Sequence, residues 1–198
     1  MKKIAILLVS VLLLTGCTAV KIDTKSIDNI LKVVLSKENN LYNRVGKGYK
    51  YYIPRSVIYI DTDELNDRLY SNGNYYYLYI DAISYANKIK LDYKENQSAY
   101  YSRKITKPKE GYLEINEENG KYHIEFMYNY AKIEALVKEE DINDVVLNAS
   151  YILSTVKFND NVIKLMLNDD YFTNKEETYD EFTSKEENNK FLKYEEES

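Results

Sequence analysis

The chain has 198 residues, a formal net charge of −5 at pH 7, one cysteine and one histidine. Its apolar content of 44% is enough for a hydrophobic core at this length, so we expect a folded protein. The single cysteine and single histidine exclude a disulfide framework and metal sites built on paired Cys or His ligands.

The net negative charge of the chain lies near its C-terminus. The segment 169–198 holds eleven acidic residues and four lysines, whereas 18–168 holds 21 residues of each sign. Nucleic acids require a basic surface, so a neutral body with an acidic end predicts no nucleic acid partner. We expect 169–198 to be an acidic, disordered tail.

The N-terminus carries a short apolar segment behind two positive charges. Lys2 and Lys3 precede the apolar run 4–14, which is shorter than the roughly 20 residues that span a bilayer. A positive start, a short apolar run and a small residue after it are typical of a secretory signal peptide.

The string Leu14-Thr15-Gly16-Cys17 ends this segment and resembles the lipobox of bacterial lipoproteins. The resemblance implies a signal peptide over 1–16, cleavage after Gly16 and a diacylglyceryl group on the thiol of Cys17. It also implies that the protein is held by lipid at the extracytoplasmic face of the cell membrane. Residues 17–24 are then a lipidated tether, in which the six residues from Thr18 to Asp23 reach about 20 Å at most when extended.

A first helix is predicted directly after the tether, where Asp23, Thr24 or Ser26 can serve as its N-cap. Apolar side chains then recur at the spacing of one helix face, at Ile27, Ile30, Leu31, Val34 and Leu35. We expect Asn39-Asn40 to end this helix.

Alternating apolar and polar residues predict strands from residue 46 to about 137. The predicted strands cover 49–53, 57–60, 75–83, 88–93, 99–105, 112–116, 122–128 and 132–137. Turns are predicted at Asn72-Gly73, at Asn119-Gly120 and at Asn129. The segment Asp63 to Tyr70 is predicted to be a short helix or an irregular loop.

A second long helix is predicted to begin after Asp141, with a short apolar strand at 156–158 and a final helical turn or two over 159–167. Its apolar stripe consists of Ile142, Val145, Val146, Ala149, Ile152 and Leu153. The order predicts a single α+β domain over 25–168: an antiparallel β-sheet of about six to eight strands, flanked by an N-terminal and a C-terminal helix.

Two phrases resemble PsbP-like domains: Gly48 to Pro54 followed by a second strand, and the end of the last long helix running into 152–158. The resemblance covers roughly 25–168 and implies an α/β/α sandwich that begins with a helix. It supplies no catalytic residue.

Tyr75, Tyr77 and Tyr79 share one face of a predicted strand, opposite Tyr76, Leu78 and Ile80. Such a stripe of rings could be a stacking surface for a glycan or a partner. The alternative is a sheet face that packs under a helix or is simply half-exposed, and we favour packing. We retain Tyr75, Tyr77 and Tyr79 as a possible binding surface.

Few residues suggest catalysis or metal binding. His123 is the sole candidate base and shares a strand face with Glu125, which indicates a polar surface pair more than a catalytic dyad. Carboxylates cluster at Asp61, Asp63 and Glu64, with Asp67 beyond. Asp61 and Asp63 could begin a cation site, but we favour a helix N-terminus there. We therefore predict no metal and no cofactor.

The segment 103–109 is the only basic run, and it could contact an anionic envelope polymer or be a charged hairpin loop. The sequence favours an anchored lipoprotein that is not an enzyme and that binds a protein or a cell-wall polymer. The alternative is a carboxylate-dependent hydrolase of wall glycan or peptide, in which Asp61, Asp63 or Glu125 would meet a second acid in a cleft.

Overall fold

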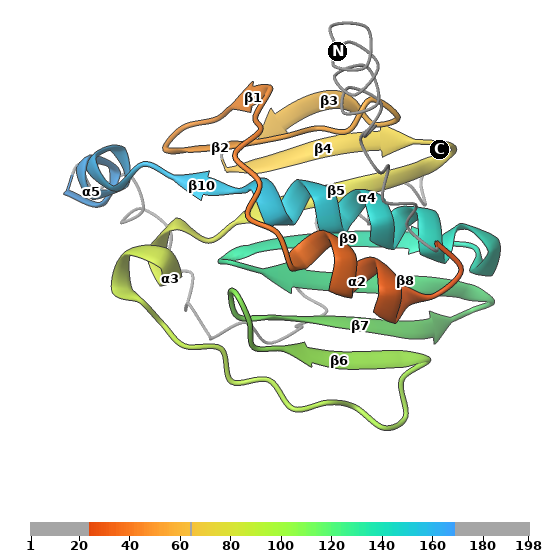
Figure 1. Cartoon of the computed structure of the whole chain (residues 1–198). Coiled ribbons are helices and arrows are strands. Elements are labelled where there is room, and N and C mark those ends of the chain that lie inside the picture. The colour runs from red at the N-terminus through yellow and green to blue at the C-terminus, as the bar shows by residue number, and fades with distance from the viewer. Residues whose placement is uncertain (1–23, 64, 169–198) are drawn as a thin grey trace, which may run out of the picture.

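The computed structural model describes residues 24–63 and 65–168, and it confirms the α+β class (Figure 1). The predicted signal peptide, most of the predicted tether with Cys17, and the acidic segment 169–198 lie outside the described residues. In chain order the elements are α2 (Ile27–Leu35), β1 (Arg44–Val45), β2 (Tyr49–Tyr51), β3 (Ile58–Asp63), β4 (Asn66–Ser71), β5 (Asn74–Ile80), α3 (Ala82–Asn87), β6 (Tyr101–Ile105), β7 (Gly111–Glu118), β8 (Lys121–Tyr128), β9 (Ala131–Val137), η1 (Glu139–Asp141), α4 (Ile142–Thr155), β10 (Lys157–Phe158) and α5 (Asp160–Asn168).

The main sheet has seven strands in the order β3-β4-β5-β9-β8-β7-β6, and each neighbouring pair is antiparallel. A second sheet of three short strands has the order β1-β2-β10. It joins distant parts of the chain, because β10 pairs with β2, with Lys157 opposite Lys50. Next to this pairing the Tyr52 N–H donates to Thr155 Oγ1 at 2.9 Å.

Both long helices lie on the same face of the main sheet. α2 packs against α4, and α4 packs on β8 and β9 (Figure 1). Ser26 caps α2, as one of the three predicted N-caps, by accepting from the Asn29 N–H at 3.4 Å. The resemblance to PsbP-like domains implied a helix layer on each face; in the described residues α2 and α4 form one layer.

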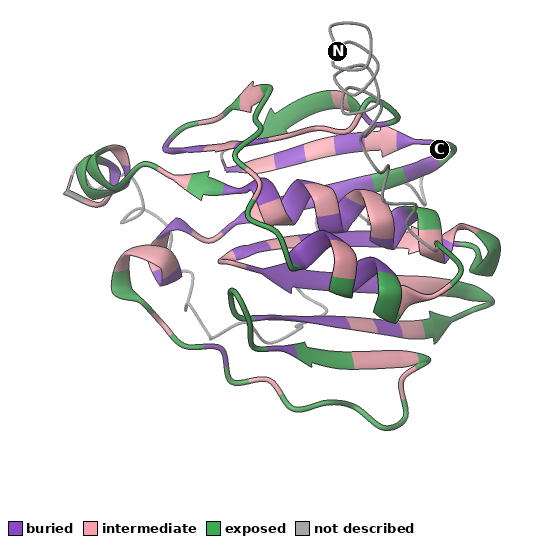
Figure 2. Cartoon of the chain, viewed as in Figure 1, coloured by how far each residue is buried: buried purple, intermediate pink, exposed green. Residues whose placement is uncertain are grey.

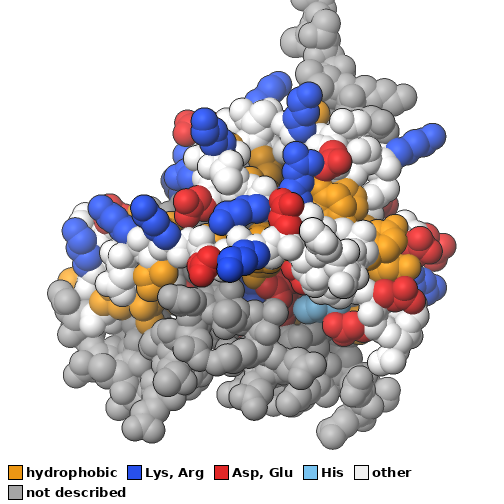
Figure 3. Space-filling model, turned by 90° about the horizontal axis from the view of Figure 1, so that it is seen from below, with side chains coloured by type: hydrophobic (Ala, Val, Ile, Leu, Met, Phe, Trp, Pro, Cys, Tyr) orange, Lys and Arg blue, Asp and Glu red, His pale blue; other side chains and the backbone are white. Residues whose placement is uncertain are grey.

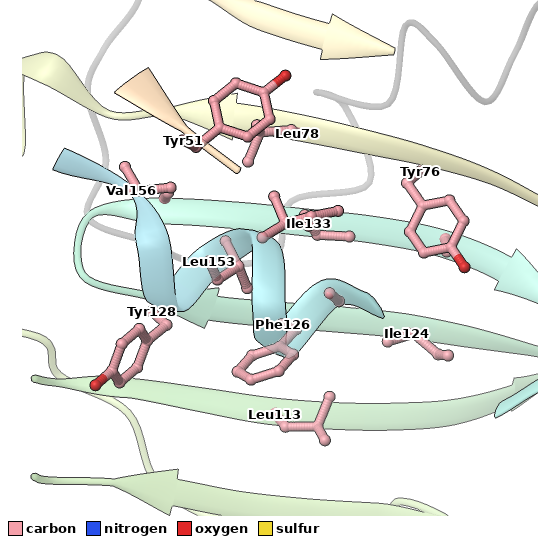
Figure 4. Packing of buried hydrophobic residues seen from close by; sticks show 14 of the residues in the cluster. Tyr51, Tyr76, Leu78, Leu113, Ile124, Phe126, Tyr128, Ile133, Leu153 and Val156 are labelled. Atoms are coloured by element: carbon pink, nitrogen blue, oxygen red, sulfur yellow. The ribbon is translucent and has the colours of Figure 1, made fainter. Parts of the chain in front are cut away.

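The core lies between this helix layer and the sheet. Its largest fully buried side chains include Phe126 of β8, Ile133 of β9 and Leu153 of α4 (Figure 4). Buried residues line the sheet side of α2 and α4, while their outer sides are exposed or half-buried (Figure 2). Burial of this apolar stripe drives the docking of the helices, at roughly 25 cal/mol per Å² of apolar surface.

All three predicted turns are confirmed. Asn72, Asn119 and Asn129 have φ of 49°, 52° and 53°, and Gly73 and Gly120 follow the first two at φ of 86° and 78°. Two successive residues at positive φ match the twist of the flanking strands, which is why Asn-Gly marks these hairpins so reliably.

Two local predictions are wrong. The segment Asp63 to Tyr70 is mostly strand β4 and not a helix or a loop, because it pairs along its length with β3 and β5. The predicted strand 88–93 is coil, and helix α3 precedes it. The Asp81 side chain caps α3 by accepting from the Ser84 N–H at 2.7 Å.

No helix among the described residues is long and apolar enough to cross a membrane.

Candidate functional site

The predicted tyrosine stripe lies on the face of the main sheet that is turned away from α2 and α4. Tyr76 and Leu78, from the alternate positions of β5, face the helices instead. The interpretation that the stripe packs under a helix is therefore wrong for the described helices, since the twofold alternation of a strand sends neighbours to opposite faces.

The three tyrosines of the stripe differ in exposure. Tyr77 is 2% exposed and Tyr79 is half-buried, whereas Tyr75 is 36% exposed. Tyr75 contacts the Tyr70 ring edge-on at 5.0 Å between centroids and the Tyr77 ring at 6.4 Å. Among the three, Tyr75 thus offers the most ring surface to a partner.

Glu125 lies on this same face and is brought next to two other glutamates. Strand register places Glu114, Glu125 and Glu134 side by side on β7, β8 and β9. We call these three residues the glutamate row. The sequence analysis placed Glu125 on the polar face of its own strand but missed Glu134, although the alternation of β9 puts Lys132, Glu134 and Leu136 on one face.

Each member of the glutamate row is held by neighbouring side chains. Lys132 Nζ lies 2.7 Å from Glu134 Oε1, and the buried Tyr112 hydroxyl donates to Glu125 Oε1. Burial is the largest cause that raises the pKa of the Tyr112 phenol, and the neighbouring Glu125 carboxylate is the second. Glu125 and Glu134 are both 5% exposed, so their carboxylates act as internal acceptors that orient tyrosines and a lysine.

Glu114 holds the coil of residues 88–100 against the sheet through hydrogen bonds. Its carboxylate accepts from the Tyr93 hydroxyl and from the side-chain amides of Asn96 and Asn116. Burial alone would raise the pKa of Glu114, but these three hydrogen bonds outweigh it and lower that pKa. The Tyr93 ring stacks on Tyr112 at 4.1 Å, so the coil covers part of this face.

His123 has no candidate nucleophile opposite it in the sheet. Its partners in register are Asn116 on β7 and Leu136 on β9. His123 Nδ1 lies 3.9 Å from Glu118 Oε1, a carboxylate that is itself largely exposed. This arrangement is a polar contact between His123 and Glu118, and within residues 24–63 and 65–168 the register partners of His123 offer no acid or hydroxyl on which it could act as a base.

The carboxylate cluster at the start of β4 is divided between two faces of the β3–β4 hairpin. Asp61 forms an ion pair with Arg68 at 2.5 Å on one face, while Asp67 points into the interior on the other. The interpretation of this cluster as a helix N-terminus is wrong because the segment is a hairpin. In residues 24–63 and 65–168, no three His, Cys, Asp or Glu side chains are arranged to hold a metal ion.

Asp67 instead forms a buried network between the two sheets. Its carboxylate accepts from the hydroxyls of Tyr51 at 2.6 Å, Tyr49 at 3.1 Å and Thr62 at 2.5 Å. Arg44 of the small sheet donates to Thr62 Oγ1 at 3.3 Å and lies over the Tyr59 ring at 3.5 Å. The network ties β2 of the small sheet to β3 and β4 of the main sheet.

The basic run 103–109 separates into a strand and a connection. Arg103 of β6 forms an ion pair with Asp28 of α2, and the Lys104 N–H donates to Glu95. Pro108 and Lys109, in the connection from β6 to β7, line an open hollow of about 330 Å³ at the end of the sheet. We call it the end hollow; its lining is Leu35, Lys37, Glu38, Asn39, Tyr85, Pro108, Lys109, Tyr128, Asn129, Ser154, Val156, Lys157 and Phe158.

The floor of the end hollow is aromatic. The rings of Tyr85 and Phe158 stack at 4.0 Å between centroids, and Tyr130 meets Tyr85 edge-on at 5.7 Å. The Tyr85 hydroxyl donates to Asp160 of α5 at 2.5 Å. The pKa of Tyr85 is raised to about 12, mainly by burial and next by this hydrogen bond to Asp160. The hollow was not predicted from the sequence, since its lining comes from five separate stretches of the chain.

Comparison of the chain with family models, with curated proteins and with solved structures gives no match. The function of the chain is therefore inferred from its own residues.

Proposed function

We propose that this chain is a membrane-anchored envelope lipoprotein with a non-enzymatic binding or accessory role toward a protein or a cell-wall polymer. The observation that carries this proposal is the string Leu14-Thr15-Gly16-Cys17 behind a short apolar run and two lysines. Helix α2 begins at Ile27, ten residues after Cys17. The short tether limits the partners of the domain to molecules near the extracytoplasmic face of the cell membrane.

We also propose that the domain is organised like PsbP-like domains. The order of elements supports this likeness, because the domain opens with helix α2 and closes with α4 running into β10.

The binding surface in this proposal is the end of the tyrosine stripe at Tyr75. Exposed aromatic rings present a large apolar area with few rotatable bonds, which suits recognition of a protein surface or a sugar ring. Tyr70 and Tyr77 support the Tyr75 ring on two sides.

A binding role is supported over the hydrolase alternative by the state of the carboxylates. Glu125 does meet a second acid, Glu134, but both are buried and each has a partner in Tyr112 or Lys132. Hydrolysis of a glycan needs two carboxylates that reach the scissile bond from either side. Asp61 and Asp63, the other candidates, lie on the edge strand β3, and Asp61 is paired with Arg68.

Replacement of Cys17 by serine is expected to release the protein from the membrane. The hydroxyl cannot accept the diacylglyceryl group, and a single lipid-bearing residue supplies the anchor in this proposal. Metabolic labelling with a radioactive fatty acid and fractionation of cells measure the effect. Thr18→Ser, one residue further, is the matched control and should keep label and location. Retained label in Cys17→Ser would contradict the anchoring.

A photoreactive phenylalanine analogue at Tyr75 is expected to capture a partner on intact cells. The same analogue at Tyr100, which is 51% exposed on the coil before β6, is the matched control and should give a much weaker adduct. Gel shifts and mass spectrometry of the adduct provide the measurement. Adducts from Tyr100 and none from Tyr75 would show that the stripe is not the binding surface.

A further inference from the structure

The end hollow holds three lysines without a carboxylate partner. Lys37 follows α2, Lys109 precedes β7 and Lys157 begins β10, and all three line the hollow. In the described part of the chain, no carboxylate lies within 4.0 Å of any of these ammonium groups. Lys157 Nζ donates to the Asn40 side chain, which is neutral.

The lining stays positive when the opposing charges are counted. Among the described residues of the lining, Glu38 is the one acidic side chain. The C-terminal ends of α2 and α4, near Leu35 and Ser154, also lie at the hollow, and each carries roughly half a negative charge. The three lysine charges, less one charge for Glu38 and about half a charge for each helix end, leave a net charge of about +1 around the end hollow.

Charge is distributed unevenly between the two ends of the sheet. Antiparallel register places Asn129 of the hollow at one end of β7–β8 and the exposed residues Glu117 and Glu118 at the other. Figure 3, seen from below, shows Lys and Arg side chains at the left, where α3 and β10 lie in Figure 1, and also at the top and centre, with Asp and Glu side chains among them; a separate group of Asp and Glu side chains lies at the lower right. A polyanion is therefore attracted to the end that holds the hollow.

The floor adds an apolar contact beside the charges. Tyr85 and Phe158 are half-buried, so the stacked pair keeps part of its surface accessible between Lys109 and Lys157. Sugar and polyol units pack their C–H faces on such rings, while ammonium groups on flexible stems reach phosphate oxygens as point charges.

We propose that the end hollow binds an anionic wall polymer, a linear chain of sugar or polyol units joined by phosphodiesters. This inference rests on the proposed extracytoplasmic location, where such a polymer meets the domain. The polymer lies across the Tyr85–Phe158 floor, and Lys37, Lys109 and Lys157 contact successive phosphates. The surface is separate from the tyrosine stripe at Tyr75.

Binding of a fluorescein-labelled glycerol phosphodiester oligomer to the full-length chain in neutral detergent tests the proposal. Three phosphate contacts predict an affinity about twentyfold lower at 200 mM salt than at 50 mM, from the slope for flexible single strands. The triple variant Lys37→Gln, Lys109→Gln, Lys157→Gln should bind at least about tenfold more weakly at 50 mM salt and lose most of this salt dependence.

The matched control replaces three exposed lysines away from the hollow, Lys94, Lys121 and Lys138, by glutamine. It changes the net charge equally and should leave the affinity within about twofold. Equal weakening by both triple variants would show non-specific attraction and overturn the site. Far-ultraviolet circular dichroism confirms that both variants fold, and Lys109→Gln alone, in an exposed connection, provides a milder second variant.

Three competitors identify the occupant. Neutral dextran should not displace the oligomer. Monomeric glycerophosphoglycerol, the headgroup of an anionic lipid, should compete far more weakly than the oligomer; equal potency would assign the hollow to lipid headgroups and overturn the proposal. A synthetic peptide of residues 169–198 that displaces the oligomer at equimolar concentration would assign the hollow to the chain's own acidic segment. These measurements use purified protein, so their failure is independent of the location of the chain in cells.

Discussion

Asp67→Ala is expected to lower the free energy of unfolding by about 3–5 kcal/mol, because it leaves two buried tyrosine hydroxyls without their acceptor, at about 1–3 kcal/mol each, and removes the acceptor of Thr62. The carboxylate is 2% exposed and accepts from three hydroxyls. Hydrogen bonds to a charged group contribute about 1.5–3 kcal/mol each, and these three share one acceptor, so their contributions do not simply add. The substitution leaves the buried hydroxyls of Tyr49 and Tyr51 without their acceptor.

Chemical denaturation followed by circular dichroism measures this loss. Asp63→Ala, an exposed carboxylate in the same hairpin, is the matched control and should change the free energy of unfolding by less than about 0.5 kcal/mol. Asp67→Asn retains one oxygen acceptor and should fall between the two. A loss below about 1 kcal/mol in Asp67→Ala would mean that the network contributes little to holding the two sheets together.

The second large effect is a steep loss of stability above about pH 10. Burial raises the pKa of Tyr49, Tyr51, Tyr79 and Tyr112, and nearby carboxylates of Asp67, Glu134 and Glu125 raise it further. In the unfolded chain these phenols titrate near the ordinary tyrosine pKa of about 10. Below that pH both states keep the protons, and the full stability is present.

Above about pH 10 the unfolded chain loses phenolic protons that the folded chain retains. The free energy of unfolding therefore falls as pH rises, by about 1.4 kcal/mol per pH unit for each such tyrosine. Four of them predict a fall of about 5 kcal/mol per unit, which is enough to unfold a domain of ordinary stability within one to two units.

Tyrosinate absorbance and circular dichroism, recorded together during an alkaline titration, measure this transition. We expect the buried tyrosines to ionise in one step that coincides with unfolding. Tyr112→Phe removes one phenol and should reduce the slope by about 1.4 kcal/mol per pH unit. Full ionisation of all tyrosines with an unchanged circular dichroism spectrum would contradict the prediction.

Local patterns predicted much of the fold. The apolar stripe and Ser26 marked α2, and three Asn-containing turns marked hairpins that the structure confirms. Alternation also assigned the correct shared face to Tyr75, Tyr77 and Tyr79. These successes depend on interactions over a few residues, where backbone sterics and side-chain period limit the choices.

Strand β4 escaped prediction because its buried polar residue has distant partners. Acidic residues at 61, 63 and 67 are typical of a helix N-terminus, and an aspartate on the core face interrupts the apolar alternation of a strand. Asp67 is tolerated there because Tyr49 and Tyr51, which precede it by 18 and 16 residues, donate to it. The residues around Asp67 in the sequence give no sign of its contacts with Tyr49 and Tyr51.

The sequence by itself determined the α+β class, the hairpins and the helix faces, and it carries a string at Leu14 to Cys17 that resembles a lipobox and predicts lipid anchoring. Only the tertiary structure decided that the tyrosine stripe faces away from the helices, that Glu125 meets Glu134, and that Lys37, Lys109 and Lys157 surround one hollow. The physical reason is the distance along the chain over which each kind of interaction acts. Period and turn chemistry act between neighbours, whereas convergence of side chains from separate elements follows from strand order and helix docking, which packing of the whole core selects.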